Sequence, residues 1–365
     1  MHVVMLSKAC IVGAYQKKLE ELARLPGLEL TVLVPPSWKD DRGVQRLERV
    51  FTSGYTLLTT PIAFNGRFHF HFYPRLSAEL KTLQPDLLHI DEEPYNLATW
   101  LAMRQAVKRG IPALFFTWQN LLRQYPPPFR WWERYNYHHA RYALAGNHDA
   151  THVLRKKGFS GPIAVIPQFG VDPILFSPMP AIQTDRPFTI GYAGGLIQAK
   201  GVDILIRACA QLSAPWELHL AGTGPAEREL RSLADALGIA DRIRWIGKLS
   251  SIAMPDFYRG LDVLVLPSRT MSNWKEQFGR VLVEAMACET PVIGSNSGEI
   301  PHVIGNAGLV FPEENVEMLA LQLRRLQQDE AERRALGRRG RQRVLERFTQ
   351  AQIAQATYDV YQQMS

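Results

Sequence analysis

Short apolar runs alternate with amphipathic segments along most of the chain. In the first half, apolar residues at helical spacing over 16–25 and 97–107 predict helices. The runs between these segments predict buried strands, at 2–6, 28–34, 86–90, 113–117, 144–146 and 163–167. Such alternation of strands and helices is typical of a parallel sheet that is covered by helices on both faces.

The alternation stops at 168–187, where prolines interrupt any regular element. The prolines are Pro173, Pro178, Pro180 and Pro187. We expect this segment to be a linker. Beyond it the pattern restarts, with helices over 202–211 and 226–237 and a helical end over 316–365. The strands expected here are 188–192, 217–221, 243–246, 263–266, 291–294 and 308–310. Two α/β domains in tandem are therefore predicted.

Two parallel-sheet domains indicate where ligands should bind. In doubly wound sheets, ligands bind beyond the carboxyl ends of the strands. The predicted fold class is α/β, with two Rossmann-like domains facing across a cleft that loops from both would line. This geometry suits an enzyme that joins two substrates.

The composition agrees with a globular protein and favours acidic partners. Hydrophobic residues make up 46% of the chain and charged residues 21%, which is ordinary for proteins with buried cores. The 42 Lys and Arg exceed the 35 Asp and Glu, so the formal net charge is +7. This excess favours phosphates, anionic lipid or nucleic acid as partners.

Cysteine usage and the first residues bear on the compartment. Cys10, Cys209 and Cys288 lie far apart without a CxxC motif, so we expect buried free thiols rather than a zinc site or a disulfide framework. Residues 1–15 lack the features of a signal peptide, and no window offers about 18 uninterrupted apolar residues. We expect a cytoplasmic protein, with room for peripheral contact at the inner face of the membrane.

Two glutamates eight positions apart are the strongest chemical signal. Glu276 precedes Gly279, and Glu284 falls inside a helix expected over 280–288. A glycine lets the backbone approach a ligand closely, and a helix start offers unpaired N–H groups to an anion. The two carboxylates could accept hydrogen bonds from hydroxyls at two points of a long ligand. The alternative is structural, with one glutamate near a helix N-terminus and one solvated.

Three glycine turns follow strands in the same half of the chain. The first contains Gly194, Gly195 and Lys200 ahead of an expected helix, which suits a phosphate cradle. The second contains Gly222, and the third is 297–301. Each alone is more often a plain turn than a site. Their order within one domain therefore carries more weight than any single turn.

Several segments together carry a family resemblance. They are 166–176 (IPQFGVDPILF), 194–201 (GGLIQAKG), 222–225 (GTGP), 263–268 (VLVLPS), 276–284 (EQFGRVLVE), 285–291 (AMACETP) and 298–304 (GEIPHVI). In this order they resemble the family-4 retaining glycosyltransferases of the GT-B fold. The resemblance implies an acceptor domain over 1–172, a donor domain over 173–345 and a last helix, 346–365, that returns to the first domain.

The resemblance also implies a donor site that needs neither a metal nor a cofactor. Glu276 should contact hydroxyls of the donor sugar, Lys200 should neutralise the diphosphate, and both should be catalytic. Glu284 should hold the ribose diol. Donor-facing positions are implied at Gly13, Gly194, Gly195, Gly222, Phe278 and Gly279. The donor would be a UDP-, GDP- or ADP-linked sugar, transferred with retention of its anomeric configuration.

The chain departs from the family pattern at two places. Gly195 stands where many members have an arginine, so the diphosphate would lose one cation. Many members have a histidine after the strand that matches 113–117, where this chain has Trp118, Gln119 and Asn120. We place Gln119 and Asn120 on the acceptor side, where a neutral amide could hydrogen-bond the reacting sugar but could not act as a base.

Further acceptor-side residues are expected in the first half. The segment 86–96 looks like the family's acceptor-side segment, and His89, Glu92 and Glu93 are candidates for binding acceptor hydroxyls. The alternative is a core histidine with two solvated or capping carboxylates. The segment 123–137 mixes arginines with aromatics, which suits a lipid interface, carbohydrate stacking or a helix with inward-facing rings. Nucleic acid is disfavoured as a partner because no nucleic-acid module motif is present.

The predicted function is that of a retaining, metal-independent hexosyltransferase. It would move a sugar from a nucleotide-diphosphate donor to a hydroxyl acceptor in glycolipid or polysaccharide synthesis. The alternatives are a nucleotide-sugar epimerase and a non-catalytic nucleotide-sugar binder, which the two departures allow. Interconversion of the free nucleotide sugar would mark an epimerase, and donor binding without turnover would mark the binder.

Overall fold

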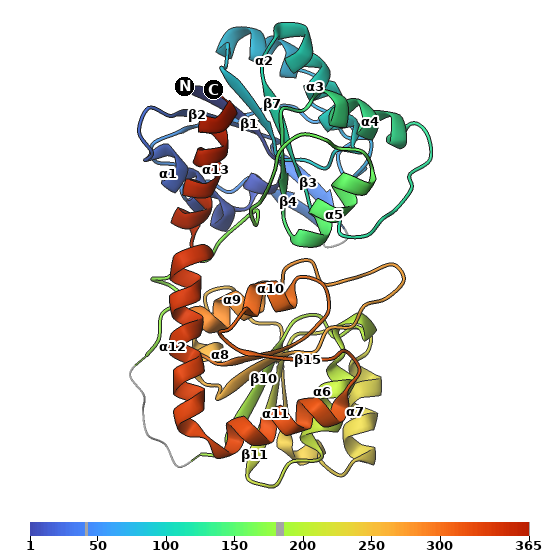
Figure 1. The fold of residues 1–365 in the computed structure, drawn as a ribbon, viewed down its shortest axis with the longest axis vertical. Helices are drawn as coiled ribbons and strands as arrows, with labels where there is room; N and C mark the ends of the chain where they lie inside the picture. Colours follow the sequence, from blue (N-terminus) through green and yellow to red (C-terminus); the bar gives the residue numbers. More distant parts are fainter. Residues whose placement is uncertain (41–42, 180–185, 365) are drawn as a thin grey trace. The chain divides into compact units, whose positions relative to one another are not determined.

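Two parallel sheets with helices on their faces make up the part of the chain that a computed structural model describes, residues 1–40, 43–179 and 186–364 (Figure 1). Contacts divide the chain into two units. Unit 1 comprises Met1–Gly170 together with the C-terminal helix, and unit 2 comprises Val171–Thr349. Of the expected linker, residues 180–185 lie outside the described part.

The sheet of unit 1 has the strand order β5-β2-β1-β6-β7-β8-β9, and every neighbouring pair is parallel. Its strands are β1 (His2–Leu6), β2 (Glu29–Val34), β5 (Thr56–Thr59), β6 (Leu87–Ile90), β7 (Ala113–Thr117), β8 (Tyr142–Ala145) and β9 (Ile163–Val165). The central strands read as continuous apolar runs because helices cover both faces of the sheet. An antiparallel hairpin, β3 (Ser37–Asp40) with β4 (Gly43–Arg46), lies outside this sheet.

Helices pack on both faces of the unit 1 sheet and form separate cores there. The helices are α1 (Lys17–Ala23), α2 (Leu76–Leu83), α3 (Leu97–Arg109), α4 (Phe129–His139), α5 (His148–Lys156) and α13 (Gln350–Met364). Two short 3-10 helices, η1 (Ala9–Ile11) and η2 (Gly13–Gln16), precede α1. On one face α13 packs beside α1, and its Ile353 and Tyr361 join the core that Val3 and Leu114 build (Figure 1).

The sheet of unit 2 is also parallel, with the order β12-β11-β10-β13-β14-β15. Its strands are β10 (Phe188–Ala193), β11 (Trp216–Ala221), β12 (Ile243–Gly247), β13 (Val263–Leu266), β14 (Val292–Ser295) and β15 (Leu309–Phe311). Its helices are η3 (Gln198–Lys200), α6 (Val202–Cys209), α7 (Glu227–Ala236), η4 (Ala240–Arg242), α8 (Met254–Arg259), α9 (Arg280–Ala287), α10 (Ile300–Ile304), α11 (Val316–Gln328) and α12 (Glu330–Arg347). The three cysteines are buried free thiols, as expected.

The structure agrees with the expected strands and helices to within a few residues, but it contains elements that the sequence pattern did not predict. The hairpin β3–β4, the edge strand β5 and the helix α2 all fall in 37–85, where no element was expected. The strands β3, β4 and β5 are short and contain a single buried residue, Leu57, so they lack the buried apolar run that reveals a central strand. Within the described residues, no helix is both long enough and apolar enough to cross a membrane.

Candidate functional site

The strand order of unit 2 fixes where its two best chemical residues lie. From β10 the chain moves to β11 and β12 on one side, and it then returns to place β13 on the other side of β10. The loops after β10 and β13 therefore leave the sheet in opposite directions, and such a switch point opens a crevice at the carboxyl ends of the strands. Lys200 follows β10 and Glu276 follows β13. Both of these predicted site residues thus lie at the switch point.

Lys200 and Glu276 form an ion pair at this edge. The Nζ atom of Lys200 lies 2.6 Å from Oε2 of Glu276, and the Ser268 hydroxyl donates to the same oxygen at 2.8 Å. The Lys200 ammonium also lies 4.9 Å from the ring centroid of Trp274. Glu276 is only 7% exposed. A buried carboxylate of this kind needs a charged partner, so an anionic ligand that recruits Lys200 must offer Glu276 hydrogen-bond donors in exchange.

The glycine turns of unit 2 touch one another because they have no side chains. A Cβ on Gly222 would lie 1.8 Å from the carbonyl oxygen of Gly194, and a Cβ on Gly298 would lie 2.0 Å from that of Glu276. Gly201, with φ +65°, packs equally closely on Pro267. The turns that follow β10, β11, β13 and β14 thus form one continuous backbone surface. Side chains at these positions would push the turns apart.

Gly195 differs from its neighbours, because its Cα faces open space. A Cβ there would meet no atom of the described chain within 4 Å. Its carbonyl oxygen accepts a hydrogen bond from the Tyr192 hydroxyl at 2.8 Å. The position where many family members have an arginine is therefore structurally free to hold a side chain.

Glu284 is held by two neighbours on α9 and α8. Its Oε2 accepts a hydrogen bond from the Tyr258 hydroxyl and its Oε1 one from Nε of Arg280, each at 2.8 Å. Burial, and then the nearby Glu284 carboxylate, raise the pKa of Tyr258 well above its usual value, so the phenol stays a donor. Gly279, with φ +77°, starts α9 in a backbone conformation that favours glycine. The Phe278 ring packs 5.8 Å from that of Phe348, between ring centroids.

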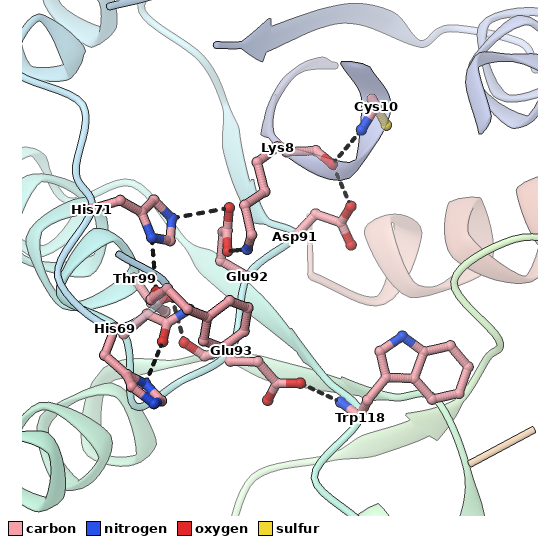
Figure 2. A network of polar contacts seen from close by, with 12 residues as sticks. Lys8, Cys10, His69, His71, Asp91, Glu92, Glu93, Thr99 and Trp118 are labelled. Atoms are coloured by element: carbon pink, nitrogen blue, oxygen red, sulfur yellow. Dashed lines mark hydrogen bonds and ion pairs between the residues drawn. The ribbon is translucent and has the colours of Figure 1, made fainter. Parts of the chain in front are cut away.

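Unit 1 has its own switch point, between β1 and β6. The residues after these strands form a polar network (Figure 2). The Ser7 hydroxyl donates to Oδ2 of Asp91 at 2.6 Å, and the ammonium of Lys8 contacts the carboxylate of Glu92. The same kind of edge that carries Lys200 and Glu276 in unit 2 therefore carries a second lysine–glutamate pair here.

Glu92 is a buried carboxylate that is kept ionised. Besides Lys8, the His71 Nε2 atom lies 3.4 Å from its Oε1, and the Tyr73 hydroxyl donates to that oxygen at 3.3 Å (Figure 2 shows Lys8 and His71). Burial alone would raise the pKa of Glu92, but the charges of Lys8 and His71 and their hydrogen bonds outweigh it and lower the pKa to about 2. Glu92 is thus fully engaged within unit 1.

Glu93 has a different environment from its neighbour and stays partly exposed. The Thr117 hydroxyl donates to its Oε2 at 2.6 Å. The backbone N–H of Trp118 donates to its Oε1 at 2.8 Å, the contact that Figure 2 shows. Burial raises the pKa of Glu93 to about 7, against the lowering effect of these two hydrogen bonds. A carboxyl group that changes charge near neutrality therefore lies directly against Trp118, at the end of β7 where many family members have a histidine.

The other predicted acceptor-side residues are less available. His89 lies inside unit 1, where its Nδ1 is 2.6 Å from the Tyr361 hydroxyl, and burial lowers its pKa to about 3. This placement favours the core alternative for His89. With its amide turned to satisfy both neighbours, Gln119 donates to Glu133 at 3.2 Å and accepts from Lys157 at 2.9 Å. Asn120 is 9% exposed.

Gly13 was expected to offer its N–H to the donor phosphates, but in the structure this group is occupied. It donates to Oε2 of Glu48 at 2.6 Å. A Cβ on Gly13 would also lie 2.3 Å from Cγ2 of Val50. A phosphate could reach this N–H only if the Glu48 carboxylate moved away.

Several residues of these networks were not identified from the sequence. They are Lys8, His71, Thr117, Tyr258 and Ser268. Lys8 and Ser268 each follow a buried strand within two residues, which is a usable signal once the strands are assigned. Thr117 ends β7, a strand that the sequence predicts, whereas the roles of His71 and Tyr258 depend on packing that the sequence does not reveal.

Two family models match the chain and together span most of it. The model described as Glycosyltransferase Family 4 matches residues 19–173, and the model described as Glycosyl transferases group 1 matches residues 180–343. The D-inositol 3-phosphate glycosyltransferase of Streptomyces bingchenggensis is 35% identical over 184 residues, which are 47% of this chain and 39% of that protein. The chain spans about two fifths to one half of the length of the curated relatives it matches.

Solved structures show the same architecture over the whole chain. Sucrose-phosphate synthase from Thermosynechococcus elongatus has a TM-score of 0.72 at 21% identity, over 100% of this chain and 98% of that one. HepE from Anabaena, solved in complex with UDP and glucose, has a TM-score of 0.69 at 17% identity, over 100% of both chains. With two parallel α/β units, these neighbours and both family models, the chain belongs to the family-4 glycosyltransferases of the GT-B fold.

Proposed function

We propose that the protein is a retaining glycosyltransferase, which moves a sugar from a nucleotide-diphosphate donor to a hydroxyl of a glycolipid or polysaccharide acceptor. The observation that carries the proposal is the Lys200–Glu276 pair at the switch point of unit 2. This pair combines a cation for a diphosphate with a carboxylate for sugar hydroxyls. Family membership and the UDP and glucose bound by HepE support the same assignment.

On the donor side, each residue has a distinct role. The Lys200 ammonium leaves Glu276 and neutralises the diphosphate, while Glu276 accepts hydrogen bonds from hydroxyls of the sugar. Glu284, held by Tyr258 and Arg280, is positioned to accept from the ribose diol. Gly194, Gly222 and Gly279 let the backbone of their turns approach the donor closely, so that loop N–H groups can reach it, although the N–H groups of Gly194 and Gly222 themselves donate to the carbonyl oxygens of Ala221 and Gly247. With Lys200 and these amides supplying the positive charge, we propose that transfer needs no metal or other cofactor.

The proposed reaction is a single displacement on one face of the sugar. The acceptor oxygen bonds to the anomeric carbon while the bond from that carbon to the diphosphate oxygen breaks. The bonding electron pair leaves with the diphosphate, and the acceptor proton passes to the departing oxygen. Lys200 and the loop amides stabilise the charge that develops on the leaving group.

On the acceptor side, we assign the main role to Glu93. Glu93 is half-buried as a residue, and Thr117 and the Trp118 N–H fix the orientation of its carboxylate, whereas Glu92 is engaged with Lys8 and His71. A fixed carboxylate can accept a hydrogen bond from an acceptor hydroxyl and orient its oxygen for attack. The Glu93 carboxylate thereby lies against Trp118, one of the residues that stand where many members of the family have a histidine.

The test is release of nucleoside diphosphate from a panel of UDP-, GDP- and ADP-sugars in the presence of EDTA, beside the Glu276→Ala variant. Release from one donor by the wild type, at least about a hundredfold slower in the variant, is the expected result. Tight donor binding without any release, with every acceptor class supplied, would favour the non-catalytic binder that the open position at Gly195 also fits. An active Glu276→Ala enzyme would overturn the site assignment.

A further inference from the structure

Two long stretches of unit 1 contain no acidic residue. Residues 49–78 and 94–132 have no Asp or Glu, whereas the second stretch alone has Arg104, Lys108, Arg109, Arg123 and Arg130. Glu133, the next acid along the chain, is 4% exposed and pairs with Lys157 at 2.7 Å. These two segments therefore contribute positive charge to unit 1 and no carboxylate of their own.

Aromatic side chains from both stretches lie against one another. Phe70 precedes α2, Phe129 and Trp132 lie on α4, and Trp100 lies on α3, which packs beside α4 (Figure 1). Ring centroids are 5.2 Å apart for Phe70 and Phe129 and 5.9 Å apart for Trp100 and Trp132. The Arg104 guanidinium lies 4.8 Å from the ring centroid of Trp100. We call these rings, with their exposed neighbours, the aromatic–basic surface, which comprises Phe68, Phe70, Trp100, Arg104, Phe129, Arg130, Trp131, Trp132 and Arg134.

Part of this aromatic surface is open to solvent. Trp131 is 61% exposed, Phe70 42% and Phe68 41%. Arg130 and Arg134 are exposed together with Trp131, while Glu133 and Tyr137 point into unit 1, so α4 presents one aromatic and basic face outward. Single exposed rings are ordinary, but exposed rings on neighbouring segments of one unit, together with arginines, suit an interface between water and lipid.

The aromatic–basic surface also adjoins the polar network at the carboxyl end of β1. The Lys8 ammonium, which contacts Glu92, lies 4.8 Å from the ring centroid of Phe68. Through His69, whose Nδ1 lies 3.3 Å from Oδ1 of Asn96, the same segment contacts the loop that carries Glu93. An occupant of this surface would therefore lie next to the residues to which we assign acceptor binding.

We propose that the aromatic–basic surface docks on the surface of an anionic lipid bilayer and presents a lipid-linked acceptor to Glu93, an acceptor assignment that rests on the proposed function. The charge of the surface selects the occupant, because arginines without acids are complementary to anionic headgroups. Tryptophan and phenylalanine are suited to the depth of the headgroups, where their rings are partly buried in the acyl region.

Vesicle sedimentation tests the docking without any enzymatic readout. Wild-type protein should sediment with phosphatidylglycerol vesicles and stay in the supernatant with phosphatidylcholine vesicles. The pair Arg130→Gln and Arg134→Gln should weaken binding about thirtyfold, since each arginine near an anionic surface contributes about fivefold. Trp131→Ser should weaken it independently of salt concentration.

Matched controls come from unit 2. Arg338→Gln with Arg339→Gln removes the same charge from exposed positions of α12, and Ile252→Ser removes an apolar side chain that is 80% exposed. Both control variants should bind vesicles like the wild type. Equal losses from both arginine pairs would reduce the effect to net charge and overturn the proposal.

Other occupants would give other results. Absence of binding to phosphatidylglycerol vesicles would refute the lipid surface as the occupant. The proposal would also be refuted if an equimolar single-stranded oligonucleotide or soluble polysaccharide abolished sedimentation with the vesicles. Because nucleoside-diphosphate release from the donor is measured separately, failure of docking and failure of the transferase function are distinguishable. An active transferase that does not bind vesicles would refute the docking proposal and leave the transferase function unaffected.

Discussion

Substitution of Gly298 probes the link between backbone packing and the position of Glu276. Gly298 has φ +55°, and a Cβ there would lie 2.0 Å from the Glu276 carbonyl oxygen, whereas ordinary contact begins near 3.4 Å. In Gly298→Ala the two loops must therefore separate by about 1.4 Å. The hydrogen bond from the Glu299 N–H to that carbonyl, 3.2 Å long, would be lost as well.

The expected effect has a backbone part and a positional part. An alanine in the left-handed region costs roughly 1–2 kcal/mol, which lowers the Tm of a domain of this size by a few degrees. A displacement of reacting groups by about 1 Å can cost about a hundredfold in rate. We therefore expect Gly298→Ala to lower kcat about a hundredfold while it lowers the stability of the fold only modestly.

Gly238→Ala is the matched control. Gly238 has φ +67° in the same unit, and a Cβ there would meet no described atom within 4 Å. It should show only the part of the fall in Tm that comes from the left-handed backbone, with unchanged kcat, whereas Gly298→Ala also loses a hydrogen bond and loop packing. Thermal unfolding and nucleoside-diphosphate release on both variants separate the two parts. Wild-type kcat in Gly298→Ala, or an equal loss of kcat in both variants, would refute the reasoning.

Three further substitutions test other contacts. The folded state favours the protonated form of Glu93, so the contribution of this group to the free energy of unfolding is full below about pH 4.5 and is lost as pH rises through about 7. In urea unfolding, Glu93→Gln should flatten this decline of stability with pH. A wild type whose stability does not decline over this range would contradict the prediction. Tyr258→Phe removes a donor to Glu284 and should raise the donor KM about tenfold with little change in kcat; an unchanged KM would separate Glu284 from donor binding. Tyr361→Phe leaves His89 without this partner and should cost roughly 1–3 kcal/mol in unfolding while kcat and the acceptor KM stay unchanged; a raised acceptor KM would instead support an acceptor role for His89.

The central strands of both sheets could be predicted because each is a short buried apolar run. The elements in 37–85 could not, since β3, β4 and β5 are short and bury only Leu57 among them; β3 and β4 pair with each other, and β5 pairs with β2. No local sequence pattern predicts the order of the strands in either sheet. It depends on which runs pair, as when Val3 of β1 lies opposite Leu87 of β6.

The candidate site was predictable as motifs but not as contacts. Motifs identify Lys200 and Glu276 separately, yet their ion pair joins residues 76 positions apart and follows from the adjacency of β10 and β13. The same reason hides Lys8, whose partner Glu92 is 84 positions away. Glycines such as Gly298 read as turns, and only the folded backbone reveals which carbonyl each one approaches.

The central claim is that the switch point of unit 2 holds a nucleoside diphosphate through Lys200. Calorimetric titration of the released nucleoside diphosphate and of the parent nucleoside, on wild type, Lys200→Ala and the control Arg338→Ala, tests it directly. A charge-assisted contact contributes about 1.5–3 kcal/mol, so Lys200→Ala should weaken diphosphate binding at least about tenfold and leave nucleoside binding unchanged, while Arg338→Ala changes neither. Equal diphosphate affinity in wild type and Lys200→Ala would contradict the claim.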